Sequence, residues 1–352
     1  MHKRHLLFWV LTLVAFVFLL WLLSEILLPF VAGVALAYLQ VPLADKMERR
    51  GMNRTVASLL IVGIVVLIFI LLAVFLVPIM AEQGAALLST VPSYVERLQA
   101  LLADPGPAWL RHLLNEGDAS KTMSEVMAQG ATYLSAVARS LWSGGKALLS
   151  FISVLVVMPV VTFYLILDWH QMVATLDDWV PLRQRETVHK LVREIDVAIS
   201  GFLRGQAAVC LIVGVYYAAA LTILGVNFGL LIGISAGILT FMPYVGSMTG
   251  LLIATGVAIG QFWPQWTWIA LVVVVFMFGQ FVEGNILAPK LVGDKVGLHP
   301  VWLIFAMFAF GYLLGFVGLL VAVPLAAAIA VLFRFALHRY MASPVYRGEE
   351  PA

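Results

Sequence analysis

Glu283 is the residue whose type and position point most directly to chemistry. It follows the apolar run Trp268–Phe281, and because an ionisable side chain at a membrane span is costly, its carboxylate is a candidate proton or cation acceptor. Gln280, about one helical turn earlier, and Asn285 are neutral side chains that could act as its partners. The alternative is a helix cap at the membrane interface, in which Glu283 pairs with Lys290.

Two more residues of this segment could take part in coupling. Pro289 lacks a backbone N–H, which would free a carbonyl near Glu283 for a ligand or a side chain. Asp294 is a second carboxylate, which a sodium/proton exchanger could use together with Glu283. The segment is therefore the predicted transport and coupling site.

Small residues recur at every fourth position in two neighbouring apolar segments, Asn227–Met242 and Ser247–Gly260. Such faces let helices approach closely in lipid, and segments this short do not comfortably cross a hydrocarbon core of about 30 Å. The pattern predicts a tight hairpin within the membrane, although ordinary packing between full-length spans is the alternative. The residues concerned are Gly225, Gly229, Gly233 and Gly237, the turn residues Pro243 and Tyr244, and Gly246 and Gly250.

A second hairpin is predicted over Val301–Phe335, which is too long for one ordinary span. Three glycines interrupt it, Gly311, Gly315 and Gly318, so it is expected to form two short limbs that turn near them. A third candidate is the polar group of Asp196, Arg204 and Gln206 at the inner end of a span. This group could hold an amphipathic helix against a moving element, or Arg204 could simply reach the lipid headgroups.

The composition indicates that these elements lie in a lipid bilayer. Apolar residues make up 62% of the 352 residues and charged residues 11%, so a water-soluble chain could not cover its surface with polar groups. We therefore predict an all-α polytopic membrane protein of about eight helices, some of them short or re-entrant. An uncleaved first span is favoured over a signal peptide at the amino terminus.

The apolar runs divide the chain into regions. The segment 81–147 is expected to form helices at the membrane surface or on the helical bundle, rather than a ligand-binding domain. Basic residues in the short loops predict that both termini are cytoplasmic. Residues 1–80 should hold three spans, 81–147 the external amphipathic segment, 148–167 the fourth span, 168–204 a cytoplasmic amphipathic helix, 205–336 the core transport region with hairpins at 225–260 and 301–335, and 337–352 a tail.

Several classes of function lack sequence support. A net charge of +2 gives no argument for nucleic acid, and the single cysteine, Cys210, excludes an internal disulfide. No phosphate-binding loop, HExxH or Gly-x-Ser-x-Gly motif occurs, so we predict neither an enzyme nor a bound cofactor or metal.

The chain resembles the autoinducer-2 exporter superfamily of bacterial membrane permeases. The likeness is carried by Glu194-x-Asp196 through Arg204-Gly205-Gln206, Pro243-x-Val-Gly246, Glu283-x-x-Ile286-x-x-Pro289 with Gly293, Leu298-x-Pro300, and Gly311-x3-Gly315-x2-Gly318 with Pro324. It implies about eight helices in the bacterial inner membrane, a homo-oligomer, most simply a pentamer, and export of small molecules such as a quorum-sensing signal. It also implies re-entrant hairpins with an elevator-like movement.

Three functions are therefore weighed. The first is a secondary exporter of a small solute, driven by a proton or sodium gradient through Glu283. The second is a Na+(Li+)/H+ antiporter. The third is a membrane scaffold that does not transport, which the two interrupted hairpins disfavour because packing alone rarely needs them.

Overall fold

The structure is a computed structural model, and it describes residues 11–12, 15, 18–19, 21–103, 145–243, 245–292, 299–343 and 346. Tyr244, Asp294 and Gly293 lie outside the described residues, as do most of the predicted external segment and the first ten residues. The predictions made for them stay predictions.

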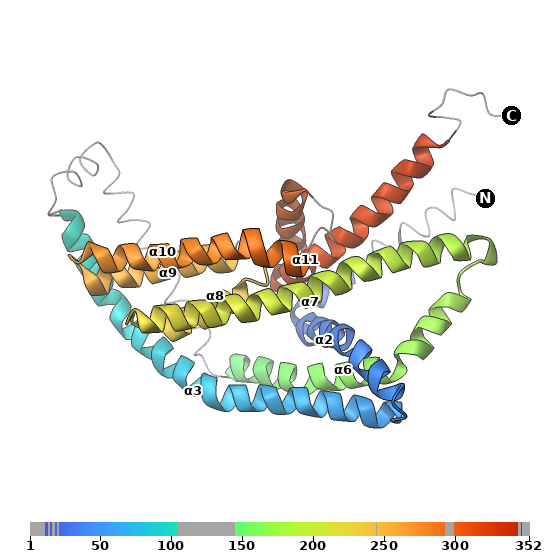
Figure 1. Ribbon diagram of the computed structural model, residues 1–352, viewed down its shortest axis with the longest axis horizontal. Coiled ribbons are helices and arrows are strands. Elements are labelled where there is room, and N and C mark those ends of the chain that lie inside the picture. Colours follow the sequence, from blue (N-terminus) through green and yellow to red (C-terminus); the bar gives the residue numbers. More distant parts are fainter. Residues whose placement is uncertain are drawn as a thin grey trace. The chain divides into compact units, whose positions relative to one another are not determined.

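The described residues form helices and no strand, which confirms the all-α prediction (Figure 1). Seven of these helices are long and apolar enough to cross a membrane, and α8 is a shorter apolar helix. The elements are α2 (Ser24–Glu48), α3 (Arg54–Ala103), α6 (Gly145–Asp178), η1 (Leu182–Gln184), α7 (Arg185–Ile223), α8 (Gly229–Leu239), α9 (Val245–Phe262), α10 (Trp266–Val282), η2 (Glu283–Val292) and α11 (Pro300–Met341).

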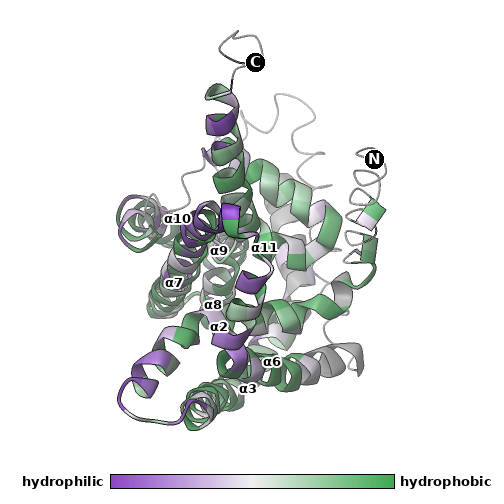
Figure 2. Ribbon diagram, turned by 90° about the vertical axis from the view of Figure 1, so that its right-hand side faces the viewer, coloured by the Kyte–Doolittle hydropathy of each residue, from purple (hydrophilic) through white to green (hydrophobic). Residues whose placement is uncertain are grey.

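Hydrophobic residues dominate these helices (Figure 2), and many of the large ones are exposed. In α3, only 6% of the most apolar window is buried within the chain, and Leu59, Val74 and Phe75 are all more than half exposed. Water could not solvate such a surface at low cost, whereas lipid chains can. The chain is a multi-pass membrane protein.

Two helices are longer than the predicted spans. Residues 1–80 were predicted to hold three spans and 81–147 an external segment, whereas the helix α3 continues unbroken to Ala103 with Pro78 and Pro92 inside it. The helix continues because a proline that removes one backbone hydrogen bond does not end a helix whose other turns remain intact. The region 168–204, predicted to be an amphipathic helix, is divided between two helices: α6 extends to Asp178, and α7 runs from Arg185 through to Ile223 (Figure 1).

The chain divides into two compact units. Unit 1 comprises Met1–Val66, Ile152–Gln206 and Ala288–Ala352, and unit 2 comprises Leu67–Phe151 and Ala207–Leu287.

In unit 1, α2 packs against α6 and the first part of α3. Ala37, Val41 and Ile166 belong to a buried cluster with Ile61 and Val62. Gly33 permits the close contact, because a Cβ there would lie 2.8 Å from the Val161 side chain. Burial of these apolar side chains joins segments far apart in the sequence.

The second predicted hairpin belongs to unit 1 and is formed by α11. The helix breaks at Gly315, whose φ of 59° and ψ of −138° suit glycine and no other residue well. The limbs then lie against each other: a Cβ at Gly318 would collide with the carbonyl of Phe310, and one at Gly311 would lie 2.9 Å from Leu319. The glycines therefore serve the turn and the close packing of the two limbs.

In unit 2, α9 packs against both α8 and α10. The 11 residues of α8 span about 16 Å, too little to cross a hydrocarbon core of about 30 Å. By contrast, α9 has 18 residues, more than predicted, and is apolar and long enough to be a candidate span. Only the first limb of the predicted hairpin is clearly shorter than a membrane span.

The glycine face of α8 lies against α7. Gly225 is not on that face, because it lies in the turn after α7 with a φ of 68°. Gly233 and Gly237 abut Ala218 and Gly214 of α7. For these two glycines, the helix before the hairpin supplies the closest backbone surface.

The small residues of α9 do contribute to the hairpin. A Cβ at Gly246 would lie 2.5 Å from the Ala236 carbonyl oxygen, and one at Gly250 would lie 2.7 Å from the side chains of Ala236 and Phe276. The hairpin is thus held between α7 on one side and α10 on the other.

The carboxyl-terminal part of α3 is hydrogen-bonded to the start of the hairpin. Gln83 accepts from the backbone N–H of Leu231 at 3.0 Å, and Asn227 donates to the Tyr94 hydroxyl at 3.1 Å. Gln261 of α9 also accepts from the Asn227 backbone N–H at 2.7 Å. These bonds satisfy backbone groups at the helix end and fix where α8 begins.

Candidate functional site

Glu283 lies at the end of α10, where the helix passes into the π-helical segment η2. Its backbone N–H bonds to the carbonyls of Gln280 and Gly279, so the α-helical pattern continues up to this residue. A widened turn is frequently found at functional sites, because it changes the direction in which side chains point.

The carboxyl group of Glu283 is partly buried. Its Oε2 atom is buried and, among the described residues, has no hydrogen-bond partner. A buried acceptor without a hydrogen bond costs free energy. Protonation of this oxygen, or a hydrogen bond from a small donor molecule, would remove that cost.

The predicted neutral partners of Glu283 bind elsewhere. Gln280 donates to the hydroxyl of Ser247, which is buried at the start of α9. Asn285 donates back to the carbonyl of Phe281 at 2.9 Å. Each of these two side-chain amides therefore donates to a group other than the carboxyl group of Glu283.

Two other predicted members of the site are placed by the structure. Pro289 lies within η2, and Lys290 near the end of that segment is exposed. The proposed pairing with Lys290 does not occur at the Oε2 atom, which remains unpartnered within the described chain.

Tyr217 of α7 and Ser247 were missed at the sequence level. Tyr217 is fully buried, with its ring stacked on Phe276 of α10 at a centroid distance of 4.4 Å. A tyrosine in an apolar span is compatible with simple core packing, so no sequence signal set it apart. The glycine at position 279 is the signal that could have been used, because it makes room for the Tyr217 ring.

The predicted inner cluster, Asp196, Arg204 and Gln206, lies on α7, and the role predicted for it stays a prediction. Asp196 accepts a hydrogen bond from the hydroxyl of Tyr38 on α2. Arg204 is exposed and Gln206 is buried. Between them, Gly205 lies against the backbone of Leu291 in η2, where a Cβ would collide with the Leu291 carbonyl. The segment therefore serves a close contact between α7 and η2 within unit 1.

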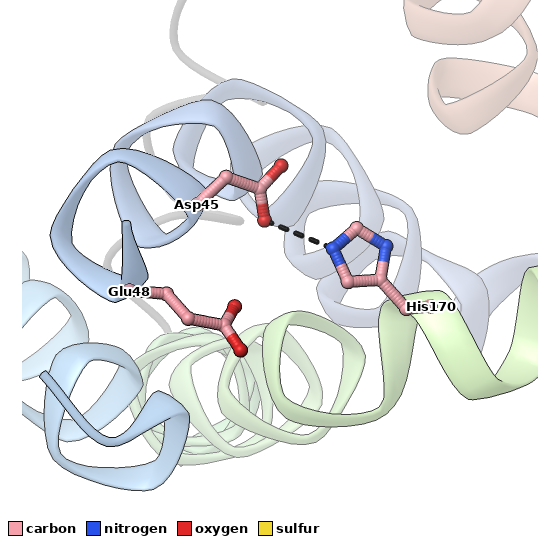
Figure 3. A group of neighbouring side chains, drawn as sticks. All are labelled: Asp45, Glu48 and His170. Atoms are coloured by element: carbon pink, nitrogen blue, oxygen red, sulfur yellow. Dashed lines mark hydrogen bonds and ion pairs between the residues drawn. The ribbon is translucent and has the colours of Figure 1, made fainter. Parts of the chain in front are cut away.

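A second charged group in unit 1 had no counterpart among the predictions (Figure 3). The group consists of Asp45 and Glu48 of α2 and His170 of α6. One carboxylate oxygen of each acid and one ring nitrogen of the histidine all lie within 4.8 Å of one another. Arg54 already binds both carboxylates, at 3.1 Å from Asp45 and 2.8 Å from Glu48.

Arg54 also donates to the carbonyls of Ile166 and Leu167, at 2.9 and 3.0 Å. Since its charge offsets the two carboxylates, the group joins α2, α3 and α6 as an ion-pair network. Asp45, Glu48 and Arg54 are neighbours in the sequence, but the α6 residues of the group lie more than 100 positions later, which is why spacing in the sequence did not reveal it.

Comparison with known proteins identifies the family. Residues 6–338 match the model of the AI-2E family transporters, which covers nearly the whole chain. The chain belongs to the AI-2E transporter family.

Relatives of this AI-2E family member agree with that assignment. It is 27% identical over 324 residues to "Putative transport protein YrrI" of Bacillus subtilis, covering 89% of this chain and 87% of the relative. It is 27% identical over 312 residues to "Putative permease PerM" of Escherichia coli K12, covering 87% and 86%. It is 25% identical over 321 residues to "AI-2 transport protein TqsA" of the same strain, covering 88% and 85%.

Family membership confirms the predicted resemblance and the general class of function. The chain is a multi-pass membrane protein of a bacterial transporter family, which favours transport over a scaffold or an enzyme. The names of these relatives give no support to sodium/proton antiport.

Proposed function

We propose that this AI-2E family member is a secondary transporter that exports a small polar solute in exchange for protons taken up through Glu283. The observation that carries the proposal is the buried, unpartnered carboxyl oxygen of Glu283 in a chain of a transporter family. The sequences of α8, α9 and α10 contain no ionisable residue before it.

The hairpins are the proposed moving or gating elements. A short helix ends inside the bilayer and exposes backbone groups there, which can contact a polar solute. The helix α8 is such a short helix. Small residues hold it against α7, so it can slide along α7 without large side chains being displaced. The α11 hairpin offers a second such end at Gly315.

The substrate class is proposed from one relative. TqsA of Escherichia coli is named as an AI-2 transport protein, so the signal AI-2 or a chemically related small metabolite is the first solute to test. Comparing the metabolites retained by cells that lack and that overproduce the protein would widen the search.

Glu283→Gln tests the proposal, because it keeps the shape of the side chain and removes its ability to ionise. Proteoliposomes loaded with AI-2 should release it faster when protons are more concentrated outside, and the variant should lose this stimulation. Glu82→Gln, which removes an exposed carboxylate of α3 in the same unit, should keep it. Equal stimulation in native and Glu283→Gln protein would exclude Glu283 from coupling.

A further inference from the structure

Tyr217 carries a second buried oxygen without a partner. The residue has no exposed surface, and its hydroxyl oxygen forms no hydrogen bond within the described chain. The phenol of the adjacent Tyr216, by contrast, donates to the carbonyl of Val275 at 3.1 Å. Buried hydroxyl groups are nearly always bonded to protein or to ordered water, so the Tyr217 hydroxyl requires a partner that the described residues do not supply.

Gly279 brings this hydroxyl close to Glu283. A Cβ at Gly279 would lie 2.6 Å from the Tyr217 hydroxyl oxygen, which places the phenol directly against the backbone of α10. Gly279 and Glu283 are four positions apart and therefore lie on one face of the helix, about 6 Å apart along its axis. Because helical side chains lean towards the amino terminus, the Glu283 carboxyl group leans towards the turn that contains Gly279.

Few other ionisable groups face this position in unit 2. Neither α8 nor α9 contains an ionisable residue, and α10 contains none before Glu283. On α7, Cys210 and Tyr217 lie within electrostatic range of Glu283. Tyr216 lies within the same range of Tyr217. No Lys, Arg or His occurs in residues 207–282, so these helices can offer the Glu283 carboxylate only a neutral hydrogen-bond donor.

We propose that Tyr217 and Glu283 together hold one buried water molecule, through which Glu283 gains and loses its proton. The water accepts from the Tyr217 hydroxyl and donates to Oε2 of the ionised carboxylate. A proton that arrives from solvent converts the water to hydronium, which passes one proton to Oε2 and is water again. Tyr217 keeps its own proton throughout and acts as a positioning residue.

This inference deepens the proposed function, since it assigns the route by which the coupling group is protonated. It does not depend on which solute is moved. The water can be detected in protein that carries no solute, so its presence and the transport activity are separately measurable.

Infrared difference spectroscopy between acidic and neutral solution tests the proposal directly. We expect a water O–H band that shifts in H2(18)O, together with the carbonyl band of protonated Glu283. Both bands should be missing in Glu283→Gln. In Tyr217→Phe the water band should be lost, and the carbonyl band should move to higher wavenumber because the carboxyl group loses its hydrogen bond.

Tyr216→Phe is the matched control, because it removes a hydroxyl from the neighbouring residue and should leave both bands in place. The proposal is wrong if Tyr217→Phe keeps the water band, or if both tyrosine variants change the spectrum equally. If Tyr217→Phe does not fold, the infrared spectrum of the native protein still tests the proposal. The absence of any (18)O-sensitive band in that spectrum would refute the shared water. If the bands behave as expected while the gradient does not stimulate efflux, the proposed function fails and the water site stands.

Discussion

Gly233→Leu is expected to leave little folded protein. A Cβ at position 233 would collide with the backbone of Ala218 and would lie 2.6 Å from the carbonyl carbon of Tyr217. Because the obstacle is the backbone of α7 and not a flexible side chain, neither helix can yield locally. We expect a cost of about 3 kcal/mol, the upper end of the range for overpacking.

The measurement is the apparent melting temperature of the detergent-solubilised protein, together with the monodisperse fraction in size-exclusion chromatography. Gly256→Leu is the matched control, because within the described chain no atom lies within 4 Å of a Cβ at Gly256 of α9. The control should change stability by less than about 0.5 kcal/mol. Equal losses in the two variants would show that α8 does not depend on close approach to α7.

Gly315→Ala is expected to impair transport for a different reason. There is open space around a Cβ at Gly315, so nothing collides, but the φ of 59° is one that L-residues rarely adopt. Holding alanine there costs about 1–3 kcal/mol, which the turn can relieve only by reorienting the two limbs of α11. We therefore expect solute efflux to fall strongly while the protein still folds.

Gly63→Ala is its control, since Gly63 of α3 has equally open surroundings within the described residues and no positive φ. This change should leave efflux unaltered and raise helix stability slightly. Normal efflux in Gly315→Ala would show that the turn tolerates other backbone angles and that its geometry is not required for transport.

The elements predicted best from the sequence are those with one simple physical cause. Long apolar runs predicted the spans, because only a helix satisfies its backbone groups in lipid. The turn in α11 was also predictable, since Gly311, Gly315 and Gly318 interrupt a run too long for one span. Both features are readable from neighbouring residues alone.

The partners of those elements were harder to predict. The glycine face of α8 indicated close packing but could not indicate that α7 supplies the backbone nearest to Gly233 and Gly237. The length of α9 was underestimated, because its helix begins at Val245, directly after the turn. Periodicity gives the face of a helix, whereas the neighbour depends on how several helices cross.

The candidate site was predicted only in part. Glu283 stands out as an ionisable residue after an apolar run, and the structure leaves its Oε2 without a partner in the described chain. Its neighbour Tyr217 lies more than 60 positions earlier and looks like ordinary core. The bonds of Gln280 and Asn285 to Ser247 and Phe281 also depend on geometry that the sequence does not contain.

The most direct test of the hairpin account is the reactivity of its tip towards a membrane-impermeant maleimide. Tyr312 lies beside the turn of α11 and is 91% exposed within the chain, while Arg339 lies in the last turn of the same helix. Single cysteines at these two positions, in a Cys210→Ala background, would be labelled in permeabilised vesicles that open both membrane faces.

If the hairpin turns inside the bilayer, Tyr312→Cys should react far more slowly than Arg339→Cys from either face. Fast and equal reaction at both positions would place the turn in water as an ordinary loop between complete spans. That result would contradict the proposed translocation route.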